Sequence, residues 1–458
     1  MFLRRRTLTL TNRDLRPILQ DLRSKNDALA WTYPGEPATR QPVHTVYGGA
    51  HLFRAGTAQK LGAAALSVLE EYAPDEQTFA EALGLYADEE QAAGDPPAIR
   101  EKVVEKLRTE PVEDYRIDFE DGYGTRPDDE EDGHARSAAG EVASGYAAGT
   151  LPPFIGIRIK PMSREGHARG LRTLDLFLTT LVRLANGGLP SGFVVTLPKV
   201  MSPGHVSAVS RACAALERRL KLTEDSIRIE LMIETPQAIL GPDGTSTLLR
   251  LVEAGEGRVT GAHFGTFDYT ALCGITAAWQ DIRHQACDFA RNMMQVALAQ
   301  TAVRLSDSVT TTMPVPPHRE VPGTQLTEAQ RRANVETVHR AWKEHAGNVR
   351  HSLINGYYQG WDLHPAQLPA RYGAVYAFFQ SARPAATARL RTFVEGAAQA
   401  MLVGDVFDDE ATGQGLLNFF VRGLNSGAIG LAEAQETGLS AEELQGRSFR
   451  AIVEGRRP

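Results

Sequence analysis

The sequence has 458 residues, of which 42% are hydrophobic and 23% are charged, and its formal net charge is −7. This composition excludes an intrinsically disordered chain, and the acidic balance argues against nucleic acid as the main partner. No stretch approaches the length of a membrane span, and no apolar segment of signal-peptide length follows "MFLRRR". Three scattered cysteines indicate neither a disulfide framework nor a zinc site, so we expect a cytoplasmic protein.

Apolar segments alternate with helical ones along most of the chain. Residues 1–40 are expected to form a helical N-terminal extension that ends in the Pro/Gly-rich connection "YPGEPATRQP". Residues 384–458, which are helical in pattern and rich in Gly and Ala, are expected to form a C-terminal helical segment. The predicted strands between them are 44–53, 115–121, 154–161, 192–200, 229–233, 258–268, 306–316 and 356–365.

Eight strands separated by helices predict parallel strands joined by crossovers. Continuous apolar strands are typical of a sheet that is covered on both faces. We therefore expect residues 41–383 to form an α/β fold, a (β/α)8 TIM barrel, with a doubly wound sheet as the alternative. No glycine fingerprint of the dinucleotide-binding type supports that alternative.

Polar residues stand where the predicted strands end, which is the end of a barrel where chemistry gathers. Two carboxylates from neighbouring strands can hold one Mg²⁺, and an arginine fork can bind a substrate carboxylate. Such a site could stabilise the negative charge of a 2-oxo acid or an enolate. The strand-end residues are Asp118, Glu120, Asp121, Arg158, Lys160, Lys199, Glu234, Asp268 and His364.

Four of these residues also have a purely structural interpretation. Glu234 could form a salt bridge with a lysine or arginine of the barrel, and Arg158 could pair with the "DFED" segment. Asp268 could cap a helix that begins at Tyr269. His364, which precedes a proline, could be a turn residue. The acidic run "PDDEEDG" at residues 127–133 is expected to be a solvated loop.

Six segments, in order, resemble the citrate lyase β-subunit-like branch of the HpcH/HpaI aldolase family. They are "DFEDGYGTRPDDEEDGHAR", "IGIRIK", "LPKV", "MIETPQAIL", "FGTFDYTALCGI" and "GYYQGWDLHPAQL". The resemblance runs from about Val43 to about Leu417 and implies a TIM barrel of the phosphoenolpyruvate/pyruvate superfamily.

The resemblance implies a metal and substrate site. Glu234 and Asp268 correspond to the family's two acidic ligands of Mg²⁺, with Mn²⁺ as a possible replacement. Arg158 corresponds to the arginine that binds the carboxylate of the substrate. Gly265 and Thr266 correspond to the loop whose backbone cradles the oxo-acid end of that small carboxylic acid.

The resemblance also implies residues that move protons. Glu120 matches the second acid of the family's strand-two motif, and Asp121 stands where the metal-dependent HpaI-type aldolases have a histidine base. In the tail, "MLVGDVFDDEA" is distantly similar to a family segment, which places Asp408 on an aspartate lent to a neighbouring subunit. That assignment implies a homo-oligomer, either a trimer or a hexamer.

The function expected from these residues is a Mg²⁺-dependent carbon–carbon lyase or aldolase that acts on a 3-hydroxy acid or its CoA thioester. The start "YGGAHLFRAG" differs from the family's usual one, so a CoA thioester and a free acid both stay open as substrates. The alternative is a non-catalytic barrel that binds a small acid as a sensor or scaffold. Phosphoenolpyruvate or phosphoryl chemistry ranks lower, because no phosphate-binding loop is evident.

Overall fold

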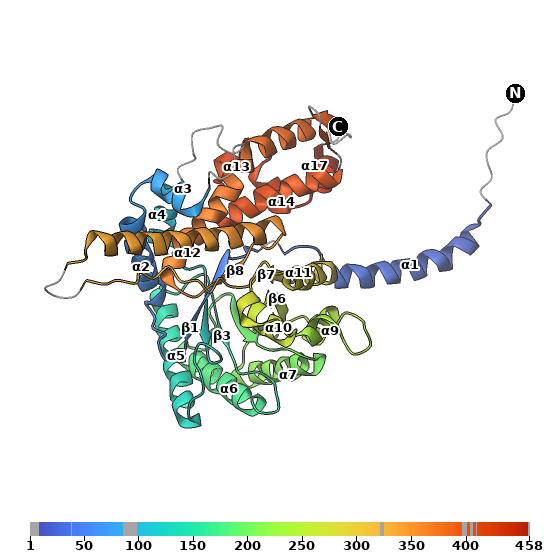
Figure 1. The fold of residues 1–458 in the computed structure, drawn as a ribbon. Helices are drawn as coiled ribbons and strands as arrows, with labels where there is room; N and C mark the ends of the chain where they lie inside the picture. Colours follow the sequence, from blue (N-terminus) through green and yellow to red (C-terminus); the bar gives the residue numbers. More distant parts are fainter. Residues whose placement is uncertain are drawn as a thin grey trace.

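The protein folds as a barrel of parallel strands surrounded by helices (Figure 1). The computed structural model describes residues 9–37, 39–85, 99–320, 325–395, 401–403, 406–408 and 410–456. Seven strands pair in the order β7-β6-β5-β4-β3-β2-β1, and β8 pairs with β1. A parallel bridge between Val309 and Trp361 brings the segment after β7 against β8. The predicted (β/α)8 TIM barrel is thereby confirmed.

The eight strands are short, which is usual for a barrel. Their bounds are β1 His44–Gly49, β2 Asp114–Asp118, β3 Phe154–Arg158, β4 Phe193–Leu197, β5 Arg228–Ile233, β6 Val259–Phe264, β7 Arg304–Ser306 and β8 Gly360–Asp362.

Helices follow the strands and cover the outside of the barrel. They are α2 Thr57–Tyr72, α3 Glu76–Leu83, α4 Ile99–Thr109, α5 Asp128–Ala148, α6 His167–Leu184, α7 Pro203–Leu220, α8 Pro236–Ile239, α9 Leu248–Glu253, α10 Thr266–Leu272, α11 Gln285–Leu298, α12 Glu328–Ile354 and α13 Leu368–Glu395. Two short 3₁₀ helices are η2 Ala277–Trp279 and η3 Pro365–Gln367. No helix among these described ranges is long and apolar enough to cross a membrane.

Successive side chains of each strand point alternately outward, into the core beneath the helices, and inward, into the barrel interior. On β5, Ile229, Leu231 and Ile233 are buried in the large hydrophobic core that the helices complete. The alternate positions Glu230, Met232 and Glu234 point the other way, into the barrel. A single strand therefore places one carboxylate low in the barrel, a methionine in the middle and a second carboxylate at the top.

The interior is consequently layered. Tyr47, Met232, Val309 and Trp361 form a small apolar cluster of their own. Charged side chains lie on both sides of this apolar layer, because Glu230 and Glu234 flank Met232 on the same strand. The charged residues on the two sides have different surroundings, as described below.

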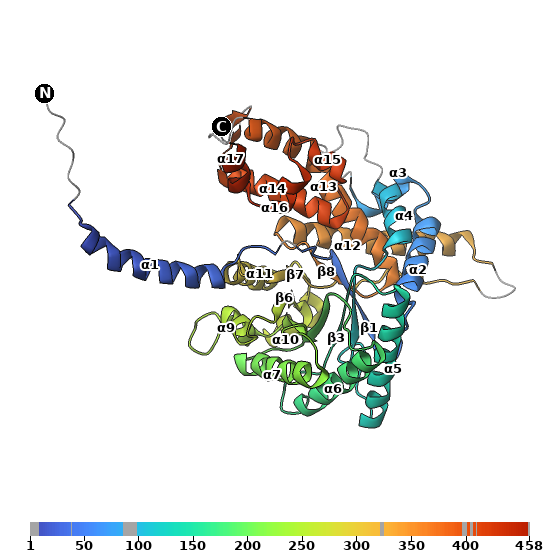
Figure 2. The same cartoon turned by 180° about the vertical axis from the view of Figure 1, so that it is seen from behind.

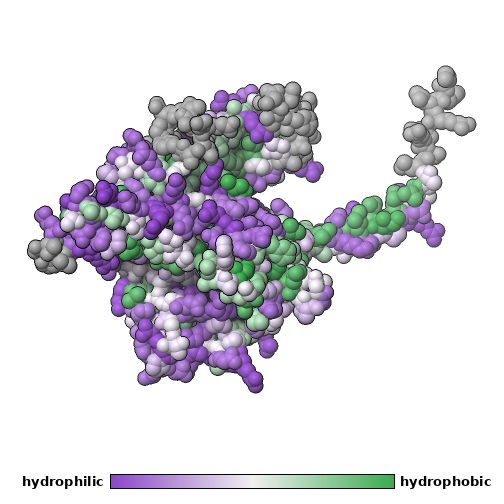
Figure 3. Space-filling model, in the orientation of Figure 1, coloured by the Kyte–Doolittle hydropathy of each residue, from purple (hydrophilic) through white to green (hydrophobic). Residues whose placement is uncertain are grey.

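The two ends of the chain lie outside the barrel helices. Helix α1, Asn12–Thr32, extends away from the body of the molecule in both views (Figures 1 and 2), and none of its residues is buried. Apolar side chains line much of it in Figure 3. The C-terminal part contains the hairpin β9 Met401–Val403 and β10 Val406–Asp408, then α14 Glu410–Ser426, α15 Leu431–Gln435, α16 Ala441–Gly446 and α17 Phe449–Arg456. The predicted boundary at residues 383/384 falls inside α13, and the division into three parts stays a prediction.

Two local predictions were wrong. Of the predicted strand 306–316, only Ser306 lies in β7, which ends there. The described chain beyond it contributes the isolated bridge at Val309 to the sheet. Pro314 and Pro316 lack the N–H groups that a longer strand would need. The acidic run at 127–133 is not a solvated loop but the start of α5, where acidic side chains are favoured by the helix dipole.

Candidate active site

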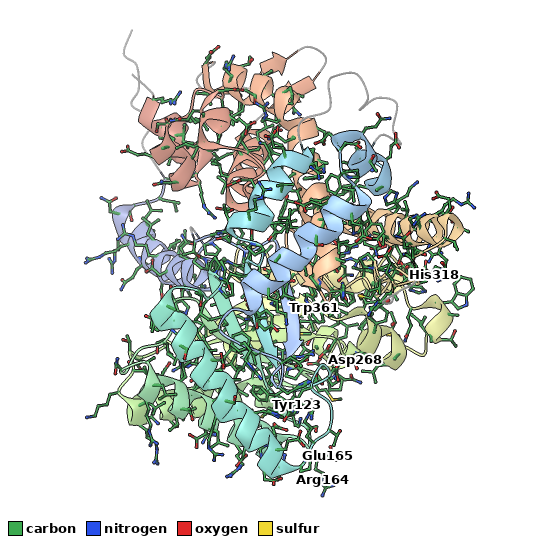
Figure 4. The ribbon with its side chains drawn as sticks, turned by 90° about the vertical axis from the view of Figure 1, so that its left-hand side faces the viewer. Tyr123, Arg164, Glu165, Asp268, His318 and Trp361 are labelled. Atoms are coloured by element: carbon green, nitrogen blue, oxygen red, sulfur yellow. The ribbon has the colours of Figure 1, made fainter. Side chains whose placement is uncertain are left out.

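The carboxyl ends of β2 to β6 bring most of the predicted site residues together. The group, here called the carboxylate cluster, consists of Asp118, Glu120, Asp121, Arg158, Lys199, Glu234 and Asp268. Figure 4 shows Trp361 among the strands and Asp268 nearer one end of the barrel, on the side away from the C-terminal helices. The predicted metal and substrate residues thus come to one place, although their roles stay predictions.

Arg158 ends β3 and is held by two acids of the neighbouring strand-end segment. Its Nε and Nη2 donate to the two carboxylate oxygens of Asp118 at 2.7 and 2.5 Å, and its Nη1 lies 3.2 Å from Glu120 Oε2. The guanidinium also stacks over the Tyr47 ring at 4.8 Å. The structural interpretation of Arg158 as a partner of "DFED" is therefore confirmed. A substrate carboxylate would have to share Nη1 with Glu120.

Asp118 explains why Arg158 is so firmly placed. Its two oxygens also accept hydrogen bonds from the backbone N–H groups of Glu120 and Gly122, at 2.9 and 2.7 Å. Asp118 thus ties the loop after β2 to the end of β3, and its side chain is fully buried. The strand-end pattern gave Asp118 no role of its own, and its function here is to orient Arg158 and Glu120.

Lys199 is the residue whose importance the sequence did not reveal. It follows β4 with φ of 49°, a left-handed conformation that costs a non-glycine residue about 1–2 kcal/mol. The Lys199 ammonium contacts Glu120, and it lies 3.1 Å from Asp121 and 3.7 Å from Asp268. These acids raise the pKa of Lys199 despite its partial burial, so the side chain stays a cation. Its place at the end of a predicted strand and its match to "LPKV" were its two signals in the sequence.

Glu234 is almost completely buried, with only 2% of its surface exposed. Its Oε1 accepts a hydrogen bond of 2.7 Å from the backbone N–H of Lys199. Among the described residues, no lysine or arginine side chain comes within 4 Å of this carboxylate, so the predicted salt bridge is wrong. Burial first, and then the charge of Asp268, raise the pKa of Glu234 to about 8.

Asp268 lies in the first turn of α10, with Lys199 as its ion-pair partner. Burial raises its pKa, and the charge of Asp121 adds to this effect. The helix begins at Thr266 with Gly265 as its N-cap, so Asp268 does not cap a helix starting at Tyr269.

Gly265 and Thr266 have local structural roles that the resemblance did not indicate. A Cβ at Gly265 would lie 2.5 Å from Glu234 Oε2, so only glycine leaves room for that carboxylate. The Thr266 backbone N–H donates to Ser308 Oγ at 3.0 Å, and its side chain is fully buried. That N–H is therefore already engaged, and a direct role of Thr266 in holding substrate stays a prediction.

The remaining candidates lie outside the carboxylate cluster. Lys160 pairs with Glu131 at 3.0 Å and donates to the backbone oxygen of Phe119. His364 caps η3 by accepting from the Ala366 N–H, which confirms the turn interpretation. Asp408 ends β10, but its side chain is outside the described residues.

The carboxylate cluster contains more acidic than basic side chains. Five carboxyl groups, those of Asp118, Glu120, Asp121, Glu234 and Asp268, face the two cations Arg158 and Lys199. No group of three or more His, Cys, Asp or Glu side chains is arranged as a ready metal cage in the described ranges. Mg²⁺ needs no such cage, because it is commonly bound by one or two carboxylates and keeps water or substrate oxygens. Glu234, which has no cationic side-chain partner among the described residues, and Asp268, whose charge repels it, fit that kind of site.

A cavity of about 1010 Å³ opens at the other end of the barrel. Its lining includes a buried group, here called the core network, made of Asp114, Arg116, Glu230 and His263. Each of these charges already has a partner within the group. Chemistry in this fold belongs to the carboxyl ends of the strands, so the carboxylate cluster, and not this cavity, is the candidate active site.

One of the comparisons with solved structures agrees with the barrel. A citrate lyase from Burkholderia xenovorans LB400 has a similar structure, with a TM-score of 0.53 and 19% identity over 76% of this chain and 94% of that one. A Haloferax volcanii malate synthase in complex with magnesium and glyoxylate has a TM-score of 0.44 and 13% identity, covering 90% of this chain and 96% of that one. No curated protein matches the sequence.

A family model decides where the chain belongs. The model of the domain of unknown function DUF6986 matches residues 22–452, which include the whole barrel, the carboxylate cluster and nearly all of the C-terminal helices. This protein is therefore a member of the DUF6986 family.

Proposed function

We propose that this protein is a carbon–carbon lyase or aldolase that forms or cleaves a 3-hydroxy acid, or its CoA thioester, through an enolate. The observation that carries the proposal is the buried, acid-rich cluster at the carboxyl ends of the barrel strands. Its two least compensated members are Glu234 and Asp268, the pair that the resemblance to the citrate lyase β-subunit-like branch assigns to Mg²⁺.

The proposal assigns each part of such a reaction to a residue of the cluster. In this proposal Glu234 and Asp268 hold Mg²⁺, which would stabilise negative charge developing on the enolate oxygen. Arg158 is kept rigid by Asp118 and directs Nη1 toward the substrate carboxylate. Rigid placement matters because preorganised charges require no rearrangement during the reaction.

Glu120 is the proposed proton carrier. It lies between Arg158 and Lys199, and burial raises its pKa against the effect of both cations. Asp121 is more exposed and has a lowered pKa because Lys199 and Arg158 outweigh its burial, so it favours the charged form. Asp408 of a neighbouring copy stays the proposed second proton carrier, in keeping with a homo-oligomer of three or six chains.

The test asks only whether an enolate forms, so it needs no knowledge of the second substrate. The full-length protein would be incubated with Mg²⁺ in D₂O, and loss of methyl protons from pyruvate and from acetyl-CoA would be followed separately by NMR. The controls are EDTA, the variant Glu234→Gln, and the matched variant Glu224→Gln at an exposed position.

Exchange that requires Mg²⁺ and is lost in Glu234→Gln but not in Glu224→Gln is the expected result. Exchange in pyruvate identifies a free-acid aldolase, and exchange in acetyl-CoA identifies a thioester lyase. Exchange that persists unchanged in Glu234→Gln would refute the assigned role. Tight binding of either compound without turnover would favour the alternative, a binding barrel that acts as a sensor or scaffold.

A further inference from the structure

Three arginines from distant parts of the chain line one small cavity at the N-terminal end of the barrel. Arg304 begins β7, Arg422 lies on α14 and Arg447 follows α16. The cavity has a volume of about 220 Å³, and Glu36, Pro37, Thr39 and Gln41 form part of its lining. It adjoins the 1010 Å³ cavity, since Thr39 and Arg304 line both.

The acids in the described lining do not balance the positive charge in this cavity. Arg422 pairs with Glu36 at 2.7 Å, and Glu36 is the one carboxylate in the described lining. Arg447 Nη1 donates to the Pro37 carbonyl at 2.5 Å, and Arg304 Nη2 donates to the carbonyl and hydroxyl of Thr39. Neither Arg304 nor Arg447 forms an ion pair with a carboxylate in the part of the chain that the structure describes.

The three cations also act on one another. Burial lowers the pKa of Arg304, Glu230 and Asp114 oppose this effect, and the charges of Arg422 and Arg447 add to it. Burial likewise lowers the pKa of Arg447, again with a contribution from Arg422. Two partly buried guanidinium groups that repel each other, and whose hydrogen bonds go to neutral oxygens, are stabilised by an anion placed between them.

We propose that this cavity is an anion-binding site that takes the oxyanion group, carboxylate or phosphate, of a small molecule. The planar guanidinium fork matches both kinds of oxyanion. The volume suits a group of that size, and the adjoining larger cavity offers room for the rest of the ligand. The site lies at the opposite end of the barrel from the carboxylate cluster, so it is a second site and not part of the catalytic one.

Binding would join three parts of the protein. The arginines come from the barrel and from the C-terminal helices, while their hydrogen-bond partners, among them two backbone carbonyls and the Glu36 carboxylate, belong to the connection between α1 and β1. A ligand that contacts all three arginines binds only the assembled form. By mass action it therefore stabilises the docking of the C-terminal helices and the N-terminal connection on the barrel.

The probes are inorganic phosphate and succinate, titrated separately into the full-length protein with EDTA present and ionic strength held constant with NaCl. Binding is measured by calorimetry and by the shift in melting temperature. The test variants are Arg447→Asn and Arg304→Met. Asn tolerates the left-handed backbone of residue 447, where φ is 53°. The matched control is Arg250→Gln on α9, a half-exposed arginine that pairs with Asp243 away from the cavity.

We expect saturable binding of at least one probe, weakened at least tenfold in Arg447→Asn and Arg304→Met and unchanged in Arg250→Gln. Binding of phosphate alone indicates a phosphorylated ligand, and binding of succinate alone indicates a dicarboxylic acid. Absence of saturable binding, or binding equally tight in the two test variants, overturns the proposal. If the variants do not fold, protection of Arg304 and Arg447 in the wild type against phenylglyoxal, read by mass spectrometry, decides it. Lack of protection by either probe counts against the site.

Discussion

The barrel contains two buried groups of charges that differ in how well they are balanced. In the core network, Arg116 bridges Asp114 at 2.7 Å and Glu230 at 2.6 Å, and His263 lies 3.2 Å from Glu230. Burial disfavours ionised Glu230, but Arg116 and His263 outweigh it and lower its pKa to about 2. Glu234, which directly follows the same strand, belongs to the carboxylate cluster, and there its pKa is raised to about 8.

This difference suggests a structural role for the core network and a chemical role for the carboxylate cluster. Thr45 and Thr196 complete the hydrogen bonds of the core network, at 2.9 Å to Asp114 and 3.3 Å to Glu230. Glu234 accepts a backbone hydrogen bond and Asp268 pairs with Lys199 at 3.7 Å, but these contacts do not offset the effect of burial on either carboxylate. Carboxylates with strongly perturbed pKa values at the carboxyl end of a barrel are typical of functional sites. Removing a charge should therefore harm stability in one group and activity in the other.

The largest effect on stability is expected from Arg116→Met. This change leaves two carboxylates, Asp114 and Glu230, buried without their shared cation. Removing one partner of a buried ion pair costs about 3–5 kcal/mol of unfolding free energy. Urea denaturation monitored by circular dichroism measures it. A loss below 1 kcal/mol would show that the core network is not structural.

Stability should also depend on pH through Glu234. Its folded-state pKa of about 8 lies above the ordinary 4.5, so its contribution to stability is complete below pH 4.5 and is lost as the pH rises through 8. The scale is about 1.4 kcal/mol for each unit of pKa shift. In EDTA, the unfolding free energy of the wild type should fall across this range more steeply than that of Glu234→Gln. Parallel curves for the two proteins would contradict the raised pKa.

Gly265→Ala should displace Glu234, because the new Cβ would lie 2.5 Å from Glu234 Oε2. Overpacking of this kind costs about 1–3 kcal/mol, and activity should fall further than stability. Gly133→Ala is the control, because no atom within 4 Å meets a Cβ there and alanine favours the helix α5. Full activity and Mg²⁺ affinity in Gly265→Ala would mean that the close contact is not needed.

Lys199→Met should have the smallest effect on stability, within about 1 kcal/mol, since the partly exposed ammonium is screened by solvent. Its effect on activity should be large, because Glu120 and Asp268 lose their cation and their pKa values rise. The activity profile should accordingly shift to higher pH. An unchanged pH profile would show that Lys199 does not control the pKa values of the acids on which activity depends.

The barrel and the outline of its upper cluster were predictable from the sequence. The apolar runs predict the strands, and the strand ends predict that Arg158, Glu234 and Asp268 lie together. Backbone conformation and partners distant in the chain were not predictable. The left-handed turn at Lys199 directs its ammonium into the cluster, and no composition rule foresees it.

Long-range ion pairs account for the other errors. Glu131 is buried within the acidic run because Lys160 and Arg169, from the next strand and helix, reach it at 3.0 and 3.4 Å. The sequence alone shows only a run of acids there, which resembles a solvated loop. The convergence of Arg304, Arg422 and Arg447 is hidden for the same reason, since they come from separate elements.

The central proposal is that Glu234 binds a divalent cation in the carboxylate cluster. Calorimetric titration of Mg²⁺ at pH 7, repeated in buffers of different ionisation enthalpy, tests it most directly. Because Glu234 has a pKa of about 8, the account predicts that Mg²⁺ releases close to one proton from the wild type. Glu234→Gln should release almost none and bind more weakly. No Mg²⁺ binding, or binding with a heat that is the same in every buffer, would contradict the account.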